Sequence, residues 1–125
     1  MSASLVRVLV VDDEPRVAEL LHDALIHLGY AVRLAMDGAQ ALEIVAGYHP
    51  HVVLLDLTLP GMPGDAVLER LRRADPHLPV IAMTGDADPE RARATLAQGA
   101  FDYIAKPFDL ARLARVLEAA VVSRG

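Results

Sequence analysis

The sequence contains no cysteine. Disulfide bonds, thiolate metal sites and cysteine nucleophiles are therefore excluded together, which suits the reducing cytosol. The sequence also lacks any apolar run close to the roughly 18 residues that a membrane-spanning helix needs. Its start, MSASLVRVLVVDDEP, has neither the basic beginning nor the small-residue cleavage site of a secretory signal peptide. These absences predict a soluble, cytoplasmic protein that does not enter a membrane.

Positive charge is in the minority. The chain has 12 lysine and arginine residues against 17 aspartates and glutamates, which gives a formal net charge of -5. A negative domain repels phosphate backbones, so we expect no direct binding of nucleic acid. The histidines show no pair at i and i+4 and no acidic cluster suited to a transition metal, so we expect solvated surface roles for them. They are His22, His27, His49, His51 and His77.

The chain has the length of one domain. Its 125 residues, 54% of them hydrophobic, suffice for a real core and are too few for two domains. No internal repeat, low-complexity tract or linker interrupts the sequence. We therefore expect residues 1–125 to form a single domain, which is either a stand-alone protein or the N-terminal part of a longer one.

Strand patterns alternate with helix patterns along the chain. The strand patterns are near-continuous apolar runs bounded by turn residues, and they cover residues 5–11, 30–35, 51–56, 78–84 and 102–105. The helix patterns cover residues 15–28, 37–46, 65–73 and 89–98, and a last one runs from residue 110 almost to the end. This alternation predicts an α/β fold with a parallel sheet covered by helices on both faces.

The helix patterns carry end signals and apolar stripes. Asp37 and Asp88 precede two helices as expected N-caps, and Gly29 and Gly99 follow two as expected stops. The arginines of LERLRRAD and PERARATLA are expected on solvated helix faces. One helix face of residues 15–28 is predicted to be apolar, formed by Val17, Leu20, Leu21, Ala24, Leu25 and Leu28. The buried stripe of the last helix is predicted to be Leu110, Leu113, Leu117 and Val121.

Four of the five strand patterns end at a polar group. Asp12 and Asp13 follow the first strand, and Asp56 ends the third. Thr84 ends the fourth strand, and Lys106 follows the fifth. The carboxyl ends of parallel strands share one edge of a sheet, so these groups are expected to meet there. Three carboxylates in one place repel each other unless a cation joins them.

Mg2+ is the cation that this group of residues favours. It prefers oxygen ligands and is usually held by one or two carboxylates together with a phosphate group. Lys106 adds a fixed positive charge, and Thr84 adds a hydroxyl that can donate to an anionic oxygen. Asp56 is thus equipped to attack phosphorus and receive a phosphoryl group, while the cations stabilise the charge on the equatorial oxygens.

Four motifs, taken together and in order, resemble the receiver domain of two-component response regulators. They are VLVVDDEP at residues 8–15, VVLLDLTLPGMPG at 52–64, IAMTG at 81–85 and DYIAKPF at 102–108. The resemblance covers essentially the whole chain, and the combination is highly specific although each motif alone is weak. It implies a doubly wound, flavodoxin-like sheet of five parallel strands in the order 2-1-3-4-5.

The resemblance implies a role for each acidic residue of the site. Asp56 would be the phosphoacceptor. Asp13 and Asp56 would bind Mg2+ directly, together with the backbone carbonyl of Thr58. Asp12 would act on the ion mostly through water. Thr58 and Asp86 occupy the variable positions of the family and would tune the lifetime of the phosphoryl group.

The resemblance also implies a switch. Lys106 would contact the phosphoryl group and Asp56, and the Lys106–Pro107 peptide bond would be cis. Thr84 and Tyr103 would form the switch pair: Thr84 is drawn toward the phosphoryl group, and Tyr103 enters the space that it leaves. No functional position of the family is missing from this sequence.

The expected function is therefore that of a phosphorelay switch. A histidine kinase or histidine phosphotransfer protein would supply the phosphoryl group, and the domain would catalyse only its own phosphorylation and dephosphorylation. It is thus not expected to be an enzyme with a separate substrate. Phosphorylation would alter the face formed by the fourth helix, the fifth strand and the fifth helix. An output domain, another protein or a second copy in a phosphorylation-dependent homodimer would read this face.

Three other functions fit the sequence less well. An aspartyl-phosphate phosphohydrolase needs a second aspartate two residues after the nucleophile, where this chain has Thr58. A flavodoxin-like nucleotide or flavin carrier needs a phosphate-cradling loop after the first strand, where DDEP places negative charge. A degenerate receiver that serves only as a docking module is disfavoured because every reactive position is present. Viewed in isolation, Asp12, Asp13 and Glu14 could equally cap the first helix.

Overall fold

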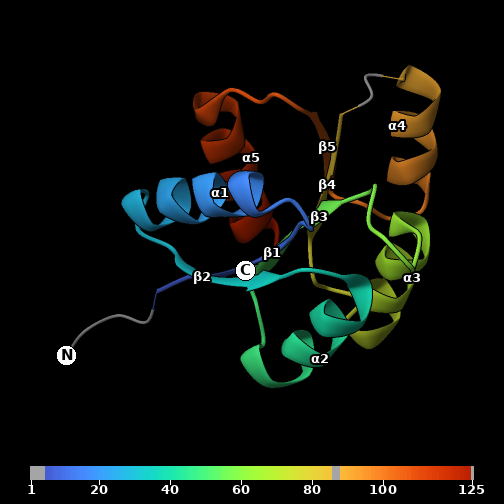
Figure 1. Cartoon of the computed structure of the whole chain (residues 1–125), viewed down its shortest axis with the longest axis horizontal. Helices are drawn as coiled ribbons and strands as arrows, with labels where there is room; N and C mark the ends of the chain where they lie inside the picture. Colours follow the sequence, from blue (N-terminus) through green and yellow to red (C-terminus); the bar gives the residue numbers. More distant parts are fainter. Residues whose placement is uncertain (1–4, 86–87, 125) are drawn as a thin grey trace.

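Strands and helices alternate strictly in the computed structural model, which describes residues 5–85 and 88–124 (Figure 1). The strands are β1 Arg7–Val11, β2 Ala31–Ala35, β3 Val52–Asp56, β4 Val80–Thr84 and β5 Asp102–Ala105. The helices are α1 Pro15–His27, α2 Gly38–Tyr48, α3 Gly64–Ala74, α4 Pro89–Ala97 and α5 Leu110–Arg124. Every expected element is present, and most ends differ from the expected ones by one or two residues.

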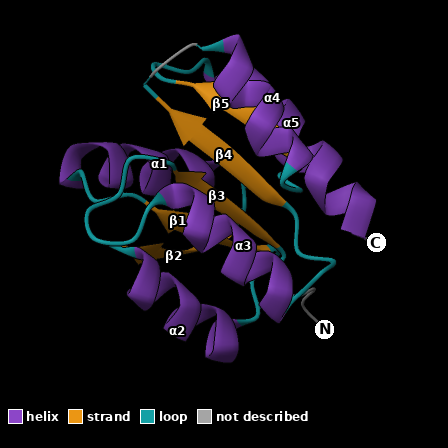
Figure 2. Ribbon diagram, turned by 90° about the vertical axis from the view of Figure 1, so that its right-hand side faces the viewer, coloured by secondary structure: helices purple, strands orange, loops and turns teal. Residues whose placement is uncertain are grey.

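The strands form one parallel sheet in the order β2-β1-β3-β4-β5. This confirms the doubly wound, flavodoxin-like order that the resemblance implied. Helices α1 and α5 cover one face of the sheet, and α2, α3 and α4 lie on the other (Figures 1 and 2). The direction of winding reverses between β1 and β3, so the carboxyl ends of these two strands are the usual place for a ligand in such a fold.

Side chains of the central strands point alternately into two apolar cores. Leu9 and Leu55 pack beneath α2 and α3, whereas Val10 and Leu54 pack beneath α1 and α5. All residues of β3 and β4 are buried, as expected for strands covered on both faces. Burying one such side chain stabilises a fold by about 1.5–3 kcal/mol. The two cores therefore form a frame that fixes the positions of the strand ends.

The expected helix caps are confirmed. Asp37 and Asp88 each accept a hydrogen bond from a backbone N–H in the first turn of the following helix, at 2.8 and 3.0 Å. Gly29 and Gly99 follow α1 and α4 with φ angles of 97° and 104°, which glycine adopts more readily than other residues. Across the part of the chain that the structure describes, no helix is both long and apolar enough to cross a membrane.

Two element ends differ from the prediction for physical reasons. Strand β1 begins at Arg7 and not at residue 5, because Leu5 is 56% exposed and lies outside the paired register. Helix α2 continues to Tyr48 instead of ending at Ala46. His49 then ends it in the left-handed conformation, with a φ of 52°. Glycine usually occupies such a position, so His49 itself gave no signal for this helix end, and the signal lay in Pro50.

Two apolar stripes are buried less completely than their spacing predicts. Leu20 and Leu28 of the α1 stripe are 67% and 44% exposed, and Leu110 of the α5 stripe is 54% exposed. Helix α1 buries the small Ala18 instead, because the arc that faces the sheet is turned toward this residue. Periodicity located both helices correctly but placed three leucines in the core that lie at the surface.

His51 departs from the expectation that the histidines are solvated. It is half-buried, and its Nδ1 atom accepts a hydrogen bond from the Arg7 backbone N–H at 2.9 Å. This bond joins the residue before β3 to the first residue of β1. The expectation is therefore wrong for His51, because its position at the start of a central strand brings it against the neighbouring strand.

Gly64 lets α3 begin directly against the chain that leaves β3. A Cβ atom at position 64 would lie 2.5 Å from the Leu57 Cα atom and 2.7 Å from the Leu57 carbonyl oxygen. Any other side chain would have to displace backbone at this point, so glycine is required by the close approach. The residues that follow Asp56 are thereby confined between the sheet and α3.

Candidate functional site

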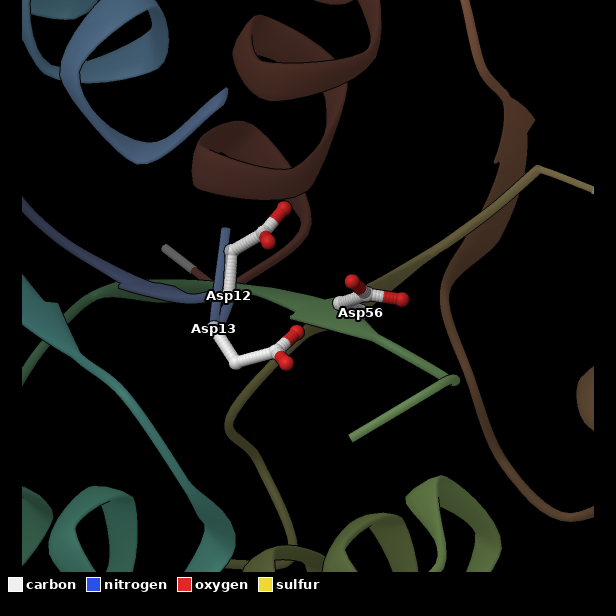
Figure 3. A group of neighbouring side chains, drawn as sticks. All are labelled: Asp12, Asp13 and Asp56. Carbon is white, nitrogen blue, oxygen red and sulfur yellow. The ribbon is translucent and has the colours of Figure 1, made fainter. Parts of the chain in front are cut away.

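Three carboxylates gather at the carboxyl ends of β1 and β3 (Figure 3). Asp12 and Asp13 follow β1, and Asp56 is the last residue of β3. Each offers an oxygen atom, and these oxygens all lie within 4.8 Å of one another. Asp12 and Asp56 are only 0% and 1% exposed, whereas Asp13 is half-buried. The carboxylates therefore meet at the edge of the sheet where the order of the strand ends predicts them.

Lys106 reaches two of these carboxylates from the end of β5. Its Nζ atom lies 2.9 Å from Asp12 Oδ2 and 3.1 Å from Asp56 Oδ2. The lysine side chain is only 16% exposed, so bulk water screens these contacts weakly. One positive charge thus offsets part of the repulsion between two buried carboxylates.

Burial and hydrogen bonding shift the pKa values of these groups in different directions. Burial raises the pKa of the Asp12 carboxyl, against opposing bonds from the Glu14 backbone N–H and from Lys106. Burial also acts to raise the pKa of Asp56, but hydrogen bonds from Thr58 and Lys106 outweigh it and leave that pKa below its usual value. Burial alone would lower the pKa of Lys106, and its two aspartate partners raise it. At neutral pH Asp56 is therefore an anion beside a cation.

Thr58 holds the carboxylate of Asp56 from the other side. The Thr58 backbone N–H and hydroxyl both donate to Asp56 Oδ1, at 2.9 and 2.8 Å. The expected roles of Thr58 were a metal-binding backbone carbonyl and an influence on the phosphoryl lifetime, and the hydroxyl bond was not expected. The signal was the spacing of an aspartate and a threonine two residues apart, which often closes a local turn through side-chain hydrogen bonds. Both oxygens of Asp56 are thus held, Oδ1 by Thr58 and Oδ2 by Lys106.

The residues expected to form a switch lie on neighbouring strands. Thr84 ends β4 and is fully buried, and Tyr103 lies on β5, half-buried against the core beneath α2 and α3. The Thr84 carbonyl accepts a hydrogen bond from the Lys106 backbone N–H at 2.6 Å, which ties the two strand ends together. The Lys106–Pro107 peptide bond is cis. Asp86, the second residue expected to influence the phosphoryl lifetime, lies outside the described residues.

Arg91 is a neighbour of the site that the sequence did not reveal. The arginines of α4 are expected on a solvated face, and Arg93 is indeed exposed. Arg91 is instead half-buried, and its Nη2 atom donates to the Leu57 carbonyl, one residue after Asp56, at 3.5 Å. Because arginines recur along this short helix, its sequence does not show which of them turns inward.

The donor set suits a hard divalent cation. Asp12, Asp13 and Asp56 offer carboxylate oxygens at one point, and oxygen ligands are those that such ions prefer. Lys106 supplies one positive charge against these three carboxylates, so repulsion remains that a cation would relieve. The cluster could therefore hold a metal ion.

Comparison with known proteins finds related sequences over most of the chain. The response regulator receiver domain model matches residues 8–118. Regulatory protein AtoC of Escherichia coli K12 is 41% identical over 115 residues, which are 92% of this chain and 25% of AtoC. Response regulator MprA of a Mycobacterium species is 41% identical over 108 residues, which are 86% of this chain and 47% of MprA. The chain thus spans a quarter to a half of the length of these relatives.

Solved structures share the arrangement of strands and helices. A CheY-like response regulator receiver domain protein from Methanospirillum hungatei has a TM-score of 0.91 at 29% identity, with 97% of both chains covered. The receiver domain of NtrX from Brucella abortus has a TM-score of 0.88 at 36% identity, covering 92% of this chain and 98% of that one. The similarity extends over nearly the whole chain and includes the strands that carry the polar residues.

Proposed function

Because this chain belongs to the response regulator receiver domain family, we propose that it accepts a phosphoryl group on Asp56 from a histidine kinase or a histidine phosphotransfer protein. The observation that supports this most is the pair of bonds from Lys106 to Asp12 and Asp56 at the mouth of the sheet. With Thr58, they keep Asp56 ionised and fixed in orientation, which a nucleophilic carboxylate requires.

The proposed reaction exchanges one bond to phosphorus for another. A carboxylate oxygen of Asp56 attacks the phosphorus of a phosphohistidine and forms an O–P bond. The P–N bond breaks, and its electron pair leaves on the histidine nitrogen. Lys106 offers an ammonium group to the phosphoryl oxygens, and Thr84 offers a hydroxyl from the neighbouring strand end. Lys106 already contacts Asp56 before the phosphoryl group arrives, whereas Thr84 would move toward that group afterwards.

We propose Mg2+ as the cation of the carboxylate cluster. Asp13 and Asp56 would bind it directly with the backbone carbonyl of Thr58, and Asp12 would act through water. When bound, the ion supplies positive charge to the phosphoryl oxygens. The oxygen-only donors and the excess of negative charge support this choice. Thr58 and Asp86 would limit the approach of hydrolytic water, and Thr58 is exposed beside Asp56 as this role requires.

A groove between α1 and the start of α5 is the proposed docking site for the protein that donates the phosphoryl group. It has a volume of about 400 Å³ and is lined in part by Leu20, Leu28 and Leu110, the leucines expected in the core but exposed. A second hollow of about 360 Å³ shares Leu20 and Phe108 with it and extends to Lys106. An apolar surface that leads to the reactive mouth suits a partner that must bring a phosphohistidine there.

The proposed output lies on the face formed by α4, β5 and α5. Leu96 of α4 and Phe101 just before β5 are 43% and 36% exposed, so apolar side chains are available to a partner. Movement of Thr84 toward the phosphoryl group and of Tyr103 into the vacated space would alter this face. The partner that binds this face would be an output domain, another protein or a second copy of the chain. Two further relatives, NtrC of Escherichia coli and TcrX of Mycobacterium tuberculosis, are named as transcriptional regulators, which supports an output in gene expression.

Residues 1–125 would form one cytoplasmic receiver domain. The family match at residues 8–118 supports this extent. Because the chain covers only part of the length of its relatives, both a stand-alone receiver and the receiver part of a longer regulator are compatible with it. The domain would catalyse its own phosphorylation and dephosphorylation and no other reaction.

The first prediction is that Asp56→Asn abolishes phosphorylation. Incubation of the parent chain with acetyl phosphate and Mg2+ should add the mass of one phosphoryl group, because the small donor needs no partner. The asparagine variant should gain none, since its amide is not a nucleophile. Removing Mg2+ with a chelator should prevent labelling of the parent. Intact-protein mass spectrometry measures all three.

Asp65→Asn is the matched control, because Asp65 is an exposed carboxylate on α3 and its loss changes the net charge equally. This variant should be labelled as well as the parent. Undiminished labelling of Asp56→Asn would overturn the assignment of the phosphoacceptor. A parent that takes no label would favour a docking module, and one that consumes acetyl phosphate continuously and rapidly would favour a phosphohydrolase.

A further inference from the structure

One peptide unit beside Asp56 is held from two sides. The unit joins Leu57 to Thr58, and its N–H donates to Asp56 Oδ1 at 2.9 Å. Its carbonyl accepts a hydrogen bond from Arg91 Nη2 at 3.5 Å. The N–H and carbonyl of a peptide group lie in one rigid plane, so a rotation that weakens one bond also tilts the other. Arg91 on α4 is thus connected to the carboxylate of Asp56 through a single peptide group.

We propose that Arg91 is a positioning residue for phosphorylation of Asp56. It orients the peptide unit between Leu57 and Thr58, and through it the N–H that holds the reacting carboxylate. The guanidinium also polarises the carbonyl and so strengthens the N–H as a donor, because hydrogen bonds in a chain reinforce one another. This inference deepens the proposed function and rests on Asp56 being the phosphoacceptor.

The surroundings of Leu57 leave this peptide unit little other freedom. The Leu57 backbone N–H donates to the Met83 carbonyl at 2.9 Å, and the Leu57 side chain is only 3% exposed. The backbone of Gly64 packs directly against Leu57 from the start of α3. The preceding peptide unit is therefore fixed by β4 and α3. The peptide unit between Leu57 and Thr58 can still rotate, and its contact with Arg91 restrains this rotation.

The same contact anchors a helix that has few other anchors. Thr95 is the one buried residue of α4, and Leu96 is 43% exposed. The Thr95 hydroxyl donates to the Arg91 carbonyl within the helix, at 2.8 Å, rather than to another element. A shift of α4 would withdraw the guanidinium from Leu57 and release the peptide unit. The position of α4 and the affinity of the site for a phosphoryl group are thereby coupled, and such coupling is reciprocal.

The test compares Arg91→Ala with Arg93→Ala, which removes the same charge from an exposed position two residues later on the same helix. In the unphosphorylated protein, NMR should show a shifted and faster-exchanging Thr58 amide in Arg91→Ala only. Phosphorylation by acetyl phosphate with Mg2+ should be slowed about threefold in Arg91→Ala, the effect expected for one weak hydrogen bond. Arg93→Ala should match the parent. Arg91→Lys, which can still donate to the carbonyl, should recover part of both signals.

Equal behaviour of Arg91→Ala and Arg93→Ala would overturn the inference, because net charge alone would then account for the effect. A shifted Thr58 amide with an unchanged phosphorylation rate would also overturn it, since the peptide unit would not matter to the reaction. Melting temperatures of both variants show whether they fold. A parent chain that takes no phosphoryl group would overturn the proposed function, and the Thr58 amide would still report separately whether Arg91 acts on the peptide unit.

Discussion

At the residue scale, the two buried aspartates of the site are in opposite situations. Asp56 gains enough hydrogen bonds to keep its pKa below the usual value, whereas burial raises the pKa of Asp12 despite its bond to Lys106. A buried carboxylate whose pKa is raised is less stable as an anion in the folded protein than in the unfolded chain. Asp12 therefore reduces the stability of the metal-free fold at neutral pH.

We predict that Asp12→Asn stabilises the metal-free protein at neutral pH by about 1 kcal/mol. With a raised folded pKa, the stabilising contribution of Asp12 is fully present below its unfolded value of 3.8 and is lost as the pH rises through the folded pKa. The advantage of the variant should therefore be largest at neutral pH and should fade in acid. Thermal unfolding in the presence of a chelator measures it at each pH. A variant less stable than the parent at neutral pH would contradict this account.

The partners of the site residues were harder to predict than the residues themselves. Asp56 and Lys106 stand at strand ends, and in a parallel sheet the position along the chain determines which edge they share. The hydroxyl bond of Thr58 and the inward turn of Arg91 depend on side-chain orientation. Packing against neighbouring elements decides the orientation of a side chain. The sequence of a single helix or loop does not contain this information.

At the element scale, α4 is the helix with the fewest apolar anchors. Its sequence contains one large apolar side chain, Leu96, and the structure leaves even this residue 43% exposed. Helix α1, in contrast, buries Leu21 and Leu25 completely or nearly so. Elements with few buried contacts open at low free energy and are the ones available to move. We therefore expect α4 and the adjoining β5 to be the mobile part of the proposed switch.

We predict that backbone amides of α4 and around Tyr103 exchange hydrogen faster than those of α1. Phosphorylation, or its beryllofluoride mimic, should slow this exchange because it can shift the equilibrium only by binding one state better. Thr84→Ala should still take up phosphate and lose much of the protection. Hydrogen-exchange mass spectrometry resolves these segments. Uniform exchange in all helices, or no response to the mimic, would refute the proposed output face.

We also predict that Leu20→Ser slows phosphotransfer from a phosphohistidine protein and leaves labelling by acetyl phosphate unchanged. Leu20 is a 67% exposed side chain in the groove beside Lys106, and losing one apolar interface anchor of this size lowers transfer by about tenfold. Val122→Ser is the control, because Val122 is 79% exposed on α5 and does not line the groove. The donor is any phosphohistidine protein that labels the parent chain. Equal rates of phosphotransfer to both variants would show that the groove is not part of the docking surface.

The apolar stripes of α1 and α5 show what the spacing of apolar residues can predict about a helix. The spacing of apolar residues predicted both α1 and α5, and their bounds agree closely with the structure. The spacing did not predict that Leu20 and Leu110 face outward. Apolar residues that face the core and apolar residues that face a docking surface recur with the same helical period, so spacing alone does not distinguish them.

At the scale of the whole molecule, the carboxylate cluster links ion binding to the stability of the fold. Asp56 meets Asp12 and Asp13 only in the folded chain, since the two groups come from the ends of different strands. An ion that binds them therefore binds the native state and not the unfolded one. Such an ion stabilises the fold by about 2.7 kcal/mol when its concentration is 100 times the dissociation constant.

We predict that Mg2+ raises the melting temperature of the parent chain and that Asp13→Ala loses most of this shift. Asp13 is the most exposed of the three carboxylates, so its removal disturbs the core little. Asp65→Ala, which removes an exposed charge on α3, should keep the full shift. Differential scanning calorimetry with Mg2+ and with a chelator gives both values. An unchanged shift in Asp13→Ala would show that the ion binds elsewhere.

The bonds of Lys106 also show that the site is assembled from distant parts of the chain. The lysine lies 94 residues after Asp12 and 50 after Asp56, so these bonds join residues that are far apart in the sequence. Contacts of such long range pay a loop-closure entropy before they contribute to stability. A nascent or truncated chain that ends before β5 would hold its acidic residues without their counter-charge. Under the proposed function, we therefore expect such a chain to accept no phosphoryl group, because it lacks the ammonium group of Lys106.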